Sequence, residues 1–329
     1  MLDLPRLQSI HLSRVPPGQL LFAEGALRWD YLLPRRTNII LEGVENIPSD
    51  RSVFLAMNHT DRYNYWPFQY QMHRLGLRYT ATWVKGKYYE NPLVSRFLDS
   101  MNNIPVPSRG YVISVLFRQA TKRKPSEAEY RFLRDLVDGK IVPQADVVAG
   151  QSEAVKLLLK TQGDGQAQPF LTWFNGHFDL MIDEVLRIHR EAVNQFDLNI
   201  LVFPQGTRSI RLSKGHTGLV QMAQYLDCAI VPVGCNGSDR VYPGNSPMAK
   251  GGRIVYRIGK PLELEGPELS PHRVRDPYRP LTREATAAHN PKFAAMTDVV
   301  MHKINDLLDP AYRFADGGSD GVQGVQRFM

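Results

Sequence analysis

Two short apolar runs restrict most strongly how this chain can fold. Residues 52–57 and 198–202 are nearly continuous in apolar side chains, and a stretch rich in polar residues follows each run. Runs of this length and character are typical of strands that are covered on both faces. A predicted helix at 183–196 leads into the second run, and this alternation of helix and strand indicates an α/β fold. We therefore predict a mixed, largely parallel sheet flanked by helices.

The stretch that follows the second predicted strand, residues 203–209, has the composition of a ligand-binding turn. A proline and a glycine stand two residues apart in it. This pair predicts a turn at the carboxyl end of the strand, where open α/β sheets bind their ligands. The turn would present Thr207 and Arg208 outward, and a guanidinium beside a glycine backbone suits phosphate. An ordinary strand-to-loop turn with a solvated arginine is the alternative interpretation.

A histidine follows the first predicted strand. Residues 58–64 place His59 among an asparagine, an aspartate and an arginine. Neutral imidazole can take a proton from a hydroxyl near pH 7 if a partner holds its other nitrogen, so His59 is a candidate general base. A histidine at such a position often has a structural role instead, and this alternative stays open.

Together, the two stretches resemble the motifs of the glycerolipid acyltransferase family related to bacterial 1-acylglycerol-3-phosphate acyltransferase. That family carries an Asn-His motif with an aspartate five residues after the histidine, and later a Phe-Pro-Glu-Gly-Thr-Arg motif. Five further segments look like other motifs of the family, in the family's order, at 39–48, 84–92, 104–109, 230–234 and 254–261. The resemblance covers residues 38–117 and 181–262 of the chain.

The resemblance implies a glycerol-phosphate acyltransferase-like fold and an O-acyltransferase that needs neither a cofactor nor a metal ion. The family moves a fatty acyl group from acyl-CoA or acyl carrier protein to the free hydroxyl of a lysophospholipid such as 1-acylglycerol-3-phosphate. His59 would take the hydroxyl proton. The residues that would bind the substrates are Lys85, near the developing oxyanion, and Arg109, Gln205, Gly206, Thr207 and Arg208, near the acceptor phosphate.

Two positions depart from the family pattern. Asn64 stands where the family has its aspartate, and Gln205 where it has glutamate. A carboxylate on the histidine Nδ1 fixes the tautomer and stabilises the imidazolium, whereas an amide does the first weakly and the second hardly at all. Asp61 lies two residues after His59 and could supply the missing charge as a third catalytic residue. Two hypotheses follow: an active acyltransferase with a displaced dyad, and a catalytically impaired protein of this fold that binds lipid or phosphate.

The charge of the chain favours anionic partners. Forty Lys and Arg against 33 Asp and Glu give a net charge of +7, which suits phosphates, acidic carrier proteins and an anionic membrane surface. The chain's Gly-x-Ser-x-Gly pattern, at 317–321, lies in the Gly-rich end and not between a predicted strand and helix, which disfavours a serine hydrolase. The absence of a Gly-x-x-x-x-Gly-Lys pattern disfavours a P-loop nucleotide-binding protein. We expect the partners to be a lysophospholipid acceptor, an acyl thioester and a membrane surface, and we expect no nucleic acid.

The sequence also bears on localisation. No stretch approaches the ~20 continuous apolar residues of a membrane span, and the first residues lack a signal-peptide pattern. Cys228 and Cys235 have no metal-ligand spacing, which favours a reducing compartment. We therefore expect a cytoplasmic protein that lies peripherally on the cytoplasmic face of the membrane.

We expect three parts along the chain. Residues 1–37 carry leucine and aromatic side chains beside arginines, and they either face a bilayer or pack on their own domain. Residues 38–265 would form the acyltransferase domain, with a helical insertion at about 118–180. Residues 266–329 would wrap the surface, form an amphipathic helix at 293–308, and end in a disordered tail.

The predicted insertion has two recognisable features. Ser126 and Glu129 have the spacing of a capping box at the start of a helix. Its aromatic residues either cover an acyl groove or pack an inserted pair of helices, and they are Phe170, Trp173, Phe174 and Phe178.

Overall fold

The computed structural model describes residues 1–315 and residue 318, and the chain divides into two compact units. Unit 1 consists of Met1–His11, Val84–Asp99 and Ile104–His189, and unit 2 of Leu12–Trp83, Ser100–Asn103 and Arg190–Met329. Helices dominate unit 1, whereas five strands lie entirely in unit 2. The predicted disordered tail lies almost entirely outside the described residues.

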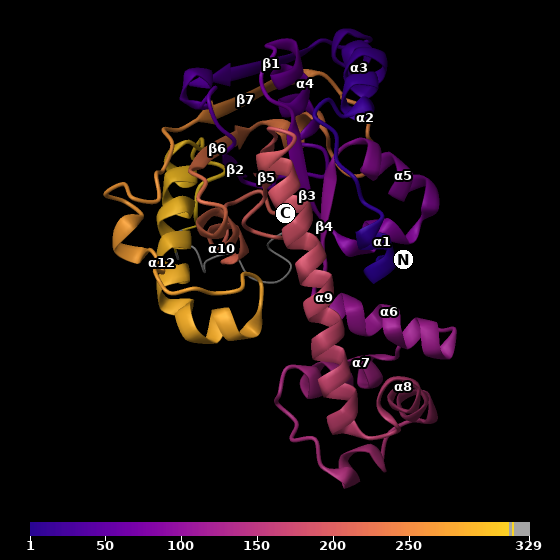
Figure 1. Cartoon of the computed structure of the whole chain (residues 1–329). Coiled ribbons are helices and arrows are strands. Elements are labelled where there is room, and N and C mark those ends of the chain that lie inside the picture. Colours follow the sequence, from indigo (N-terminus) through magenta and orange to yellow (C-terminus); the bar gives the residue numbers. More distant parts are fainter. Residues whose placement is uncertain (316–317, 319–329) are drawn as a thin grey trace. The chain divides into compact units, whose positions relative to one another are not determined.

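A seven-stranded mixed sheet has the order β1-β7-β6-β2-β5-β3-β4 (Figure 1). Its strands are β1 (Thr37–Glu42), β2 (Phe54–Met57), β3 (Thr80–Lys85), β4 (Asn103–Val106), β5 (Asn199–Val202), β6 (Ile230–Asn236) and β7 (Gly252–Ile258). The pairs β1–β7, β2–β5, β2–β6 and β3–β5 are parallel, and β6–β7 is antiparallel. The predicted α/β fold with a mixed, largely parallel sheet flanked by helices is confirmed.

The two runs that restricted the fold form central strands of this sheet. Every residue of β2 and β5 is buried, as expected where helices cover both faces of a parallel sheet. On one face, side chains of α4 (Trp66–Arg74) pack into the core of unit 2. On the other face, α10 (Gly218–Tyr225) and α12 (Arg283–Asp306) contact β2 and each other. Helices therefore cover both faces of the sheet at these two strands.

Residues 17–32 form a nearly continuous helix in unit 2. It consists of α2 (Pro17–Leu21), the π-helical segment η1 (Phe22–Leu27) and α3 (Arg28–Leu32). Ala23, Leu27 and Tyr31, spaced by four residues, lie on one face and are buried in the core. In the part of the chain that the structure describes, no helix is both long and apolar enough to cross a membrane.

Most of unit 1 is helical. Its main helices are α5 (Pro92–Ser100), α6 (Arg109–Thr121), α7 (Glu127–Val137), α8 (Glu153–Gly163) and α9 (Ala167–Asn194). The last residue of α5 and the last turn of α9 belong to unit 2. The capping box at Ser126 and Glu129 is confirmed, because each side chain accepts a hydrogen bond from the other residue's backbone N–H. The shorter helices of both units are α1 (Leu4–Gln8), α11 (Ser238–Val241) and the 3₁₀ segments Val44–Asn46, Gly86–Glu90, Ala145–Val148 and Ser270–His272.

Two helices are longer than the sequence suggested. The helix expected at 183–196 begins at Ala167, and α9 runs without a break through Gly176. A single glycine weakens a helix by about 1 kcal/mol, and the burial of Phe170, Phe174 and Phe178 outweighs this loss. The helix expected at 293–308 begins at Arg283, although Pro291 lies within it, and Thr282 caps its first turn.

Candidate active site

The loops that follow β2 and β5 form the candidate active site in unit 2. These strands are parallel neighbours, with Ala56 paired to Val202, so residues 58–64 and 203–209 start from the same edge of the sheet. The backbone N–H of Ser209 donates to the carbonyl of His59 at 2.9 Å. The structure thus brings together the two stretches that the sequence singled out.

The imidazole of His59 is held by a hydrogen bond at Nδ1 and by stacking of one ring face. Its Nδ1 lies 3.1 Å from Oδ1 of Asn64, and its ring stacks on Phe203 with 4.2 Å between the ring centroids. Nδ2 of Asn64 donates to the Asn58 carbonyl at 2.8 Å, so its Oδ1 faces the imidazole and Nδ1 carries the proton. In this tautomer Nε2 bears the lone pair, which is the state that a general base needs.

The loop that carries His59 is anchored by buried polar groups. The Asn58 side chain donates to the Cys235 carbonyl at 3.0 Å and accepts from the Cys235 N–H at 2.7 Å, which ties the loop to β6. Asn64 is fully buried, and the Tyr256 hydroxyl donates to its backbone carbonyl at 2.6 Å. Hydrogen bonds to buried polar groups fix a loop because breaking one leaves an unpaired group.

Asp61 has partners of its own. Its carboxylate accepts from the backbone N–H of Tyr63 at 2.8 Å and from the Thr60 hydroxyl at 2.9 Å. Burial raises the pKa of this carboxyl, and the hydrogen bond from Tyr63 offsets part of that effect. The geometry at Nδ1 favours Asn64 as the partner of His59, and the role of Asp61 as a charge partner stays a prediction.

Gln205 joins the two loops from a fully buried position. Its Oε1 accepts from the backbone N–H of His59 at 2.9 Å. Its Nε2 donates to the hydroxyl oxygens of Ser209 at 2.7 Å and Ser213 at 3.2 Å. Both ends of the amide are therefore engaged in holding the loops together, whereas the sequence suggested contact with a substrate. That contact stays a prediction.

We expect Gln205→Ala to lower the free energy of unfolding by about 2–4 kcal/mol, because it leaves the His59 N–H and two serine hydroxyls buried without this partner. Gln205→Glu should lose less, since a carboxylate still accepts from that N–H. Its second oxygen would face Ser209, whose hydroxyl already donates to the Arg211 carbonyl at 2.7 Å. Urea denaturation measures both variants, and a loss below about 0.5 kcal/mol for Gln205→Ala would show that the loops hold without this bridge.

The turn after β5 depends on Gly206. Its φ is +64°, and a Cβ at this position would lie 2.7 Å from Cδ2 of His216, so any L side chain would be both strained and crowded. The Thr207 hydroxyl lies 3.4 Å from the Gln205 carbonyl, a weak contact. Arg208 is half-buried, and among the described residues its guanidinium forms no hydrogen bond or ion pair. Such a group is available to an anion.

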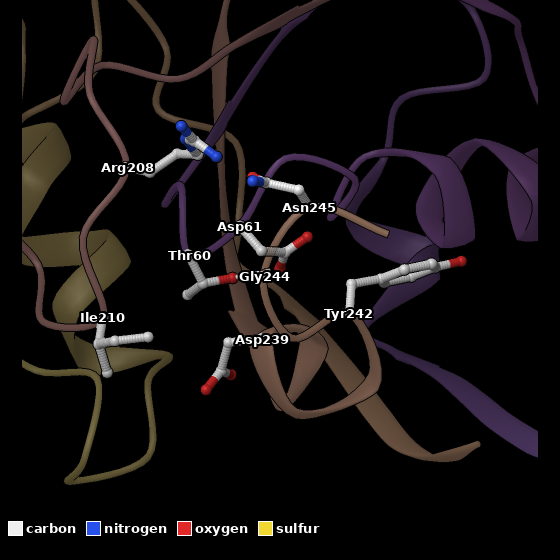
Figure 2. A pocket seen from close by; sticks show the side chains of 8 residues that line it. All are labelled: Thr60, Asp61, Arg208, Ile210, Asp239, Tyr242, Gly244 and Asn245. Carbon is white, nitrogen blue, oxygen red and sulfur yellow. Dashed lines mark hydrogen bonds between the residues drawn. The ribbon is translucent and has the colours of Figure 1, made fainter. Parts of the chain in front are cut away.

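A cavity of about 340 Å³ lies beside Arg208. The residues that line it are Thr60, Asp61, Arg208, Ile210, Asp239, Tyr242, Gly244 and Asn245. Figure 2 shows Arg208 and Asp239 at opposite ends of the cavity, with Thr60 and Asp61 between them. The described residues include no cluster of histidine, cysteine and carboxylate side chains that could hold a metal ion.

The sequence analysis did not find the part of this cavity that follows β6. Asp239, Tyr242 and Asn245 lie in α11 and in the loop after it. Because β6 runs parallel to β2, its carboxyl end lies at the same edge as His59. The rule that located the other two loops, applied to a third strand, could have found these residues.

Lys85 and Arg109 belong to unit 1. Lys85 ends β3 and is exposed. Nη2 of Arg109 donates to Oδ1 of Asn175 at 2.6 Å and to the Val137 carbonyl at 3.1 Å. The guanidinium carbon lies 5.0 and 5.3 Å from the ring centroids of Phe174 and Phe178, so the aromatic cluster holds this arginine by cation–π contacts. The roles of both residues at a substrate stay predictions.

Comparison with known proteins found similar solved structures but no matching sequence family. No protein-family model matches the chain, and a search of curated proteins found no match. The crystal structure of the 1-acyl-sn-glycerophosphate (LPA) acyltransferase PlsC from Thermotoga maritima has a TM-score of 0.42 and 15% sequence identity, and the match covers 88% of this chain and 78% of that chain.

Proposed function

We propose that this protein is an O-acyltransferase that moves a fatty acyl group from acyl-CoA or acyl carrier protein to the free hydroxyl of a lysophospholipid. The observation that carries the proposal is the contact between His59 and Asn64. It places the proton of the imidazole on Nδ1, so that Nε2 of the neutral form can accept a proton, at the strand edge where Arg208 offers a guanidinium to an anion.

The proposed reaction proceeds by direct attack. Nε2 of His59 takes the proton of the acceptor hydroxyl while its oxygen attacks the thioester carbonyl. The tetrahedral intermediate then collapses, the carbon–sulfur bond breaks, and the thiolate that leaves takes the proton from the imidazolium. The products are a diacyl phospholipid and a free thiol, so the reaction needs neither an acyl-enzyme nor a cofactor.

Basic groups would bind the acceptor phosphate and stabilise the oxyanion that forms during the reaction. Arg208 would hold the acceptor phosphate with the backbone of Gly206 and the Thr207 hydroxyl nearby. As the resemblance to the glycerolipid acyltransferase family suggests, Arg109 would contribute to the phosphate site and Lys85 would stabilise the oxyanion. Each of these roles predicts a loss of acceptor use or of rate when the side chain is truncated.

A lipid panel tests the proposal. Purified protein is incubated with a mixture of lysophospholipids and with acyl-CoA whose acyl group is isotopically labelled. A parallel reaction contains acyl carrier protein that bears the same labelled acyl group, and the lipids of both reactions are analysed by mass spectrometry. We expect a labelled diacyl species that names both the acceptor and the donor. If no diacyl species forms with either thioester, the proposal fails.

A second candidate function is a binding protein with an impaired active site. The observation that favours it is the pair of amides, Asn64 and Gln205, at positions where the resembled family has carboxylates. Without a carboxylate, the imidazolium formed during proton abstraction is poorly stabilised. Saturable lysophospholipid binding with no turnover in the lipid panel would support this function.

We further propose that the protein binds membrane surfaces through the outer face of residues 17–36. Leu21 is 75% exposed, and Trp29 and Leu33 are each 60% exposed. Arg35 and Arg36 are exposed beside them. Apolar side chains next to arginines can bury in the acyl boundary of a bilayer while the guanidinium groups meet lipid phosphates.

We expect the double substitution Leu21→Ser, Trp29→Ser to weaken partition onto anionic vesicles at least about tenfold, because each buried apolar side chain contributes about 1.5–3 kcal/mol. Tyr225→Ser, on α10, is the matched control, since Tyr225 is also exposed. Vesicle sedimentation measures both, and raising the salt should release the parent protein. Equal partition of the double variant and the parent would contradict this surface.

A further inference from the structure

We propose that the cavity beside Arg208 binds the head group of the acceptor, and that this head group is an aminoalkyl phosphodiester, as in lysophosphatidylethanolamine, and not a phosphomonoester. The inference rests on the proposed acyl transfer and specifies the acceptor class. It follows from the identity, order and charge of the groups that line the cavity.

One end of the cavity suits a phosphate. Arg208 lines it with a guanidinium that forms no ion pair among the described residues. A guanidinium donates two parallel hydrogen bonds to phosphate oxygens. Arg208 lies in the loop that Gln205 connects to the backbone of His59 by a hydrogen bond. A phosphate bound by Arg208 would therefore lie close to the loop that carries the candidate base.

The rest of the cavity, from Asp61 in its middle to Asp239 at the end opposite Arg208, suits a cation. Asp239 accepts a hydrogen bond from the Tyr312 hydroxyl at 2.7 Å, and Asp61 is held by Thr60 and Tyr63. Both carboxylates are therefore fixed in place. No lysine or arginine of the described residues forms an ion pair with either of them. Two fixed carboxylates without a protein cation are suited to an ammonium group of a ligand.

The formal charges select between acceptor classes. One guanidinium and two carboxylates give the lining a net charge of −1. A phosphomonoester would add a charge of about −2 with no further cation to offset it. A phosphodiester that carries an ammonium group adds no net charge, and it places one charge at each end opposite its counterpart (Figure 2). Partly buried charges are tolerated when they are paired in this way.

The volume agrees with a head group. A cavity of about 340 Å³ equals the liquid volume of roughly eleven water molecules at ~30 Å³ each. It is at the small end of ligand pockets, so it accommodates a phosphate and an aminoethyl group but not a long acyl chain as well. The acyl chains would therefore lie outside this cavity.

Soluble head-group analogues test the cavity without any acyl transfer. Calorimetry with the full-length His59→Ala protein compares sn-glycero-3-phosphoethanolamine with sn-glycerol 3-phosphate. We expect the phosphoethanolamine compound to bind at least about tenfold more tightly. Asp239→Asn, added to this protein, keeps an acceptor for the Tyr312 hydroxyl but removes the charge, and should abolish the preference. Asp50→Asn, which removes an exposed carboxylate outside the cavity, should leave it unchanged.

Transfer assays with His59 intact separate this inference from the proposed function. We expect a higher kcat/KM for lysophosphatidylethanolamine than for lysophosphatidate. Asp239→Asn should raise KM for lysophosphatidylethanolamine with little change in kcat. Tighter binding of glycerol 3-phosphate, a preference for an uncharged glycerol head group, or an Asp239→Asn protein that binds like Asp50→Asn would overturn the inference. If the binding preference holds but no acceptor is acylated, the cavity assignment stands and the proposed transfer fails.

Discussion

The His59→Ala protein should lose acyl transfer by about 10²–10⁴-fold and should remain folded. General-base catalysis contributes a factor of this size, and the proposed reaction has no other group at the acceptor hydroxyl. The backbone of residue 59 keeps its hydrogen bonds to Gln205 and Ser209, because these involve main-chain atoms. The loss of stacking on Phe203 lowers the free energy of unfolding by about 0.5–1.5 kcal/mol.

His216→Ala is the matched control for this substitution. The His216 ring lies against Gly206, in the loop that follows β5. His216→Ala therefore also removes an imidazole close to the site. We expect this variant to keep most of its kcat. Steady-state kinetics and circular dichroism of both variants give the comparison, and a folded His59→Ala protein with the parent rate would move the base elsewhere, His216 being the next candidate.

The second large effect is a gain of rate in Asn64→Asp. Oδ1 of Asn64 already lies 3.1 Å from Nδ1 of His59, and a carboxylate there would stabilise the imidazolium. The reverse replacement in serine proteases lowers turnover by about 10⁴-fold, so we expect kcat to rise at least about tenfold. The same change removes the hydrogen bond to the Asn58 carbonyl and should lower the free energy of unfolding by about 1–3 kcal/mol.

Asp61→Asn distinguishes the two candidate partners of His59. Because Asp61 is bonded to Thr60 and Tyr63 and lines the cavity, we expect this variant to raise KM for the acceptor with little change in kcat. A fall of kcat by a hundredfold or more, together with an unchanged rate in Asn64→Asp, would show that Asp61 supplies the charge. Measuring kcat and KM for the parent and both variants decides the question.

Local patterns predicted much of the fold and part of the site. The apolar runs that became β2 and β5 fixed two neighbouring strands, and parallel pairing then required their polar ends to meet. The contact between the loops of His59 and Arg208 follows from that rule. The capping box at Ser126 depends only on a residue three positions away, so the sequence alone predicted it.

The remaining features depend on contacts between distant residues. The spacing of Gln205 gave no sign that its amide would bridge the His59 backbone and two serines, because those bonds exist only once both loops are placed. The helix predicted at 183–196 begins instead at Ala167, because tertiary burial of the aromatic face outweighs the weak helix preference of Gly176. The opposition of Asp239 and Arg208 across the cavity depends on a third strand end (Figure 2).

One measurement tests the central claim most directly: the amount of labelled diacyl phospholipid and of free CoA thiol formed in the same reaction by the parent protein and by His59→Ala. Direct attack assisted by His59 predicts that the parent forms the two products in equal amounts and that no thiol is released without acceptor. It also predicts that His59→Ala forms both products at least about a hundredfold more slowly. Thiol release without an acceptor, or diacyl product formed equally well by the folded His59→Ala protein, would contradict the account.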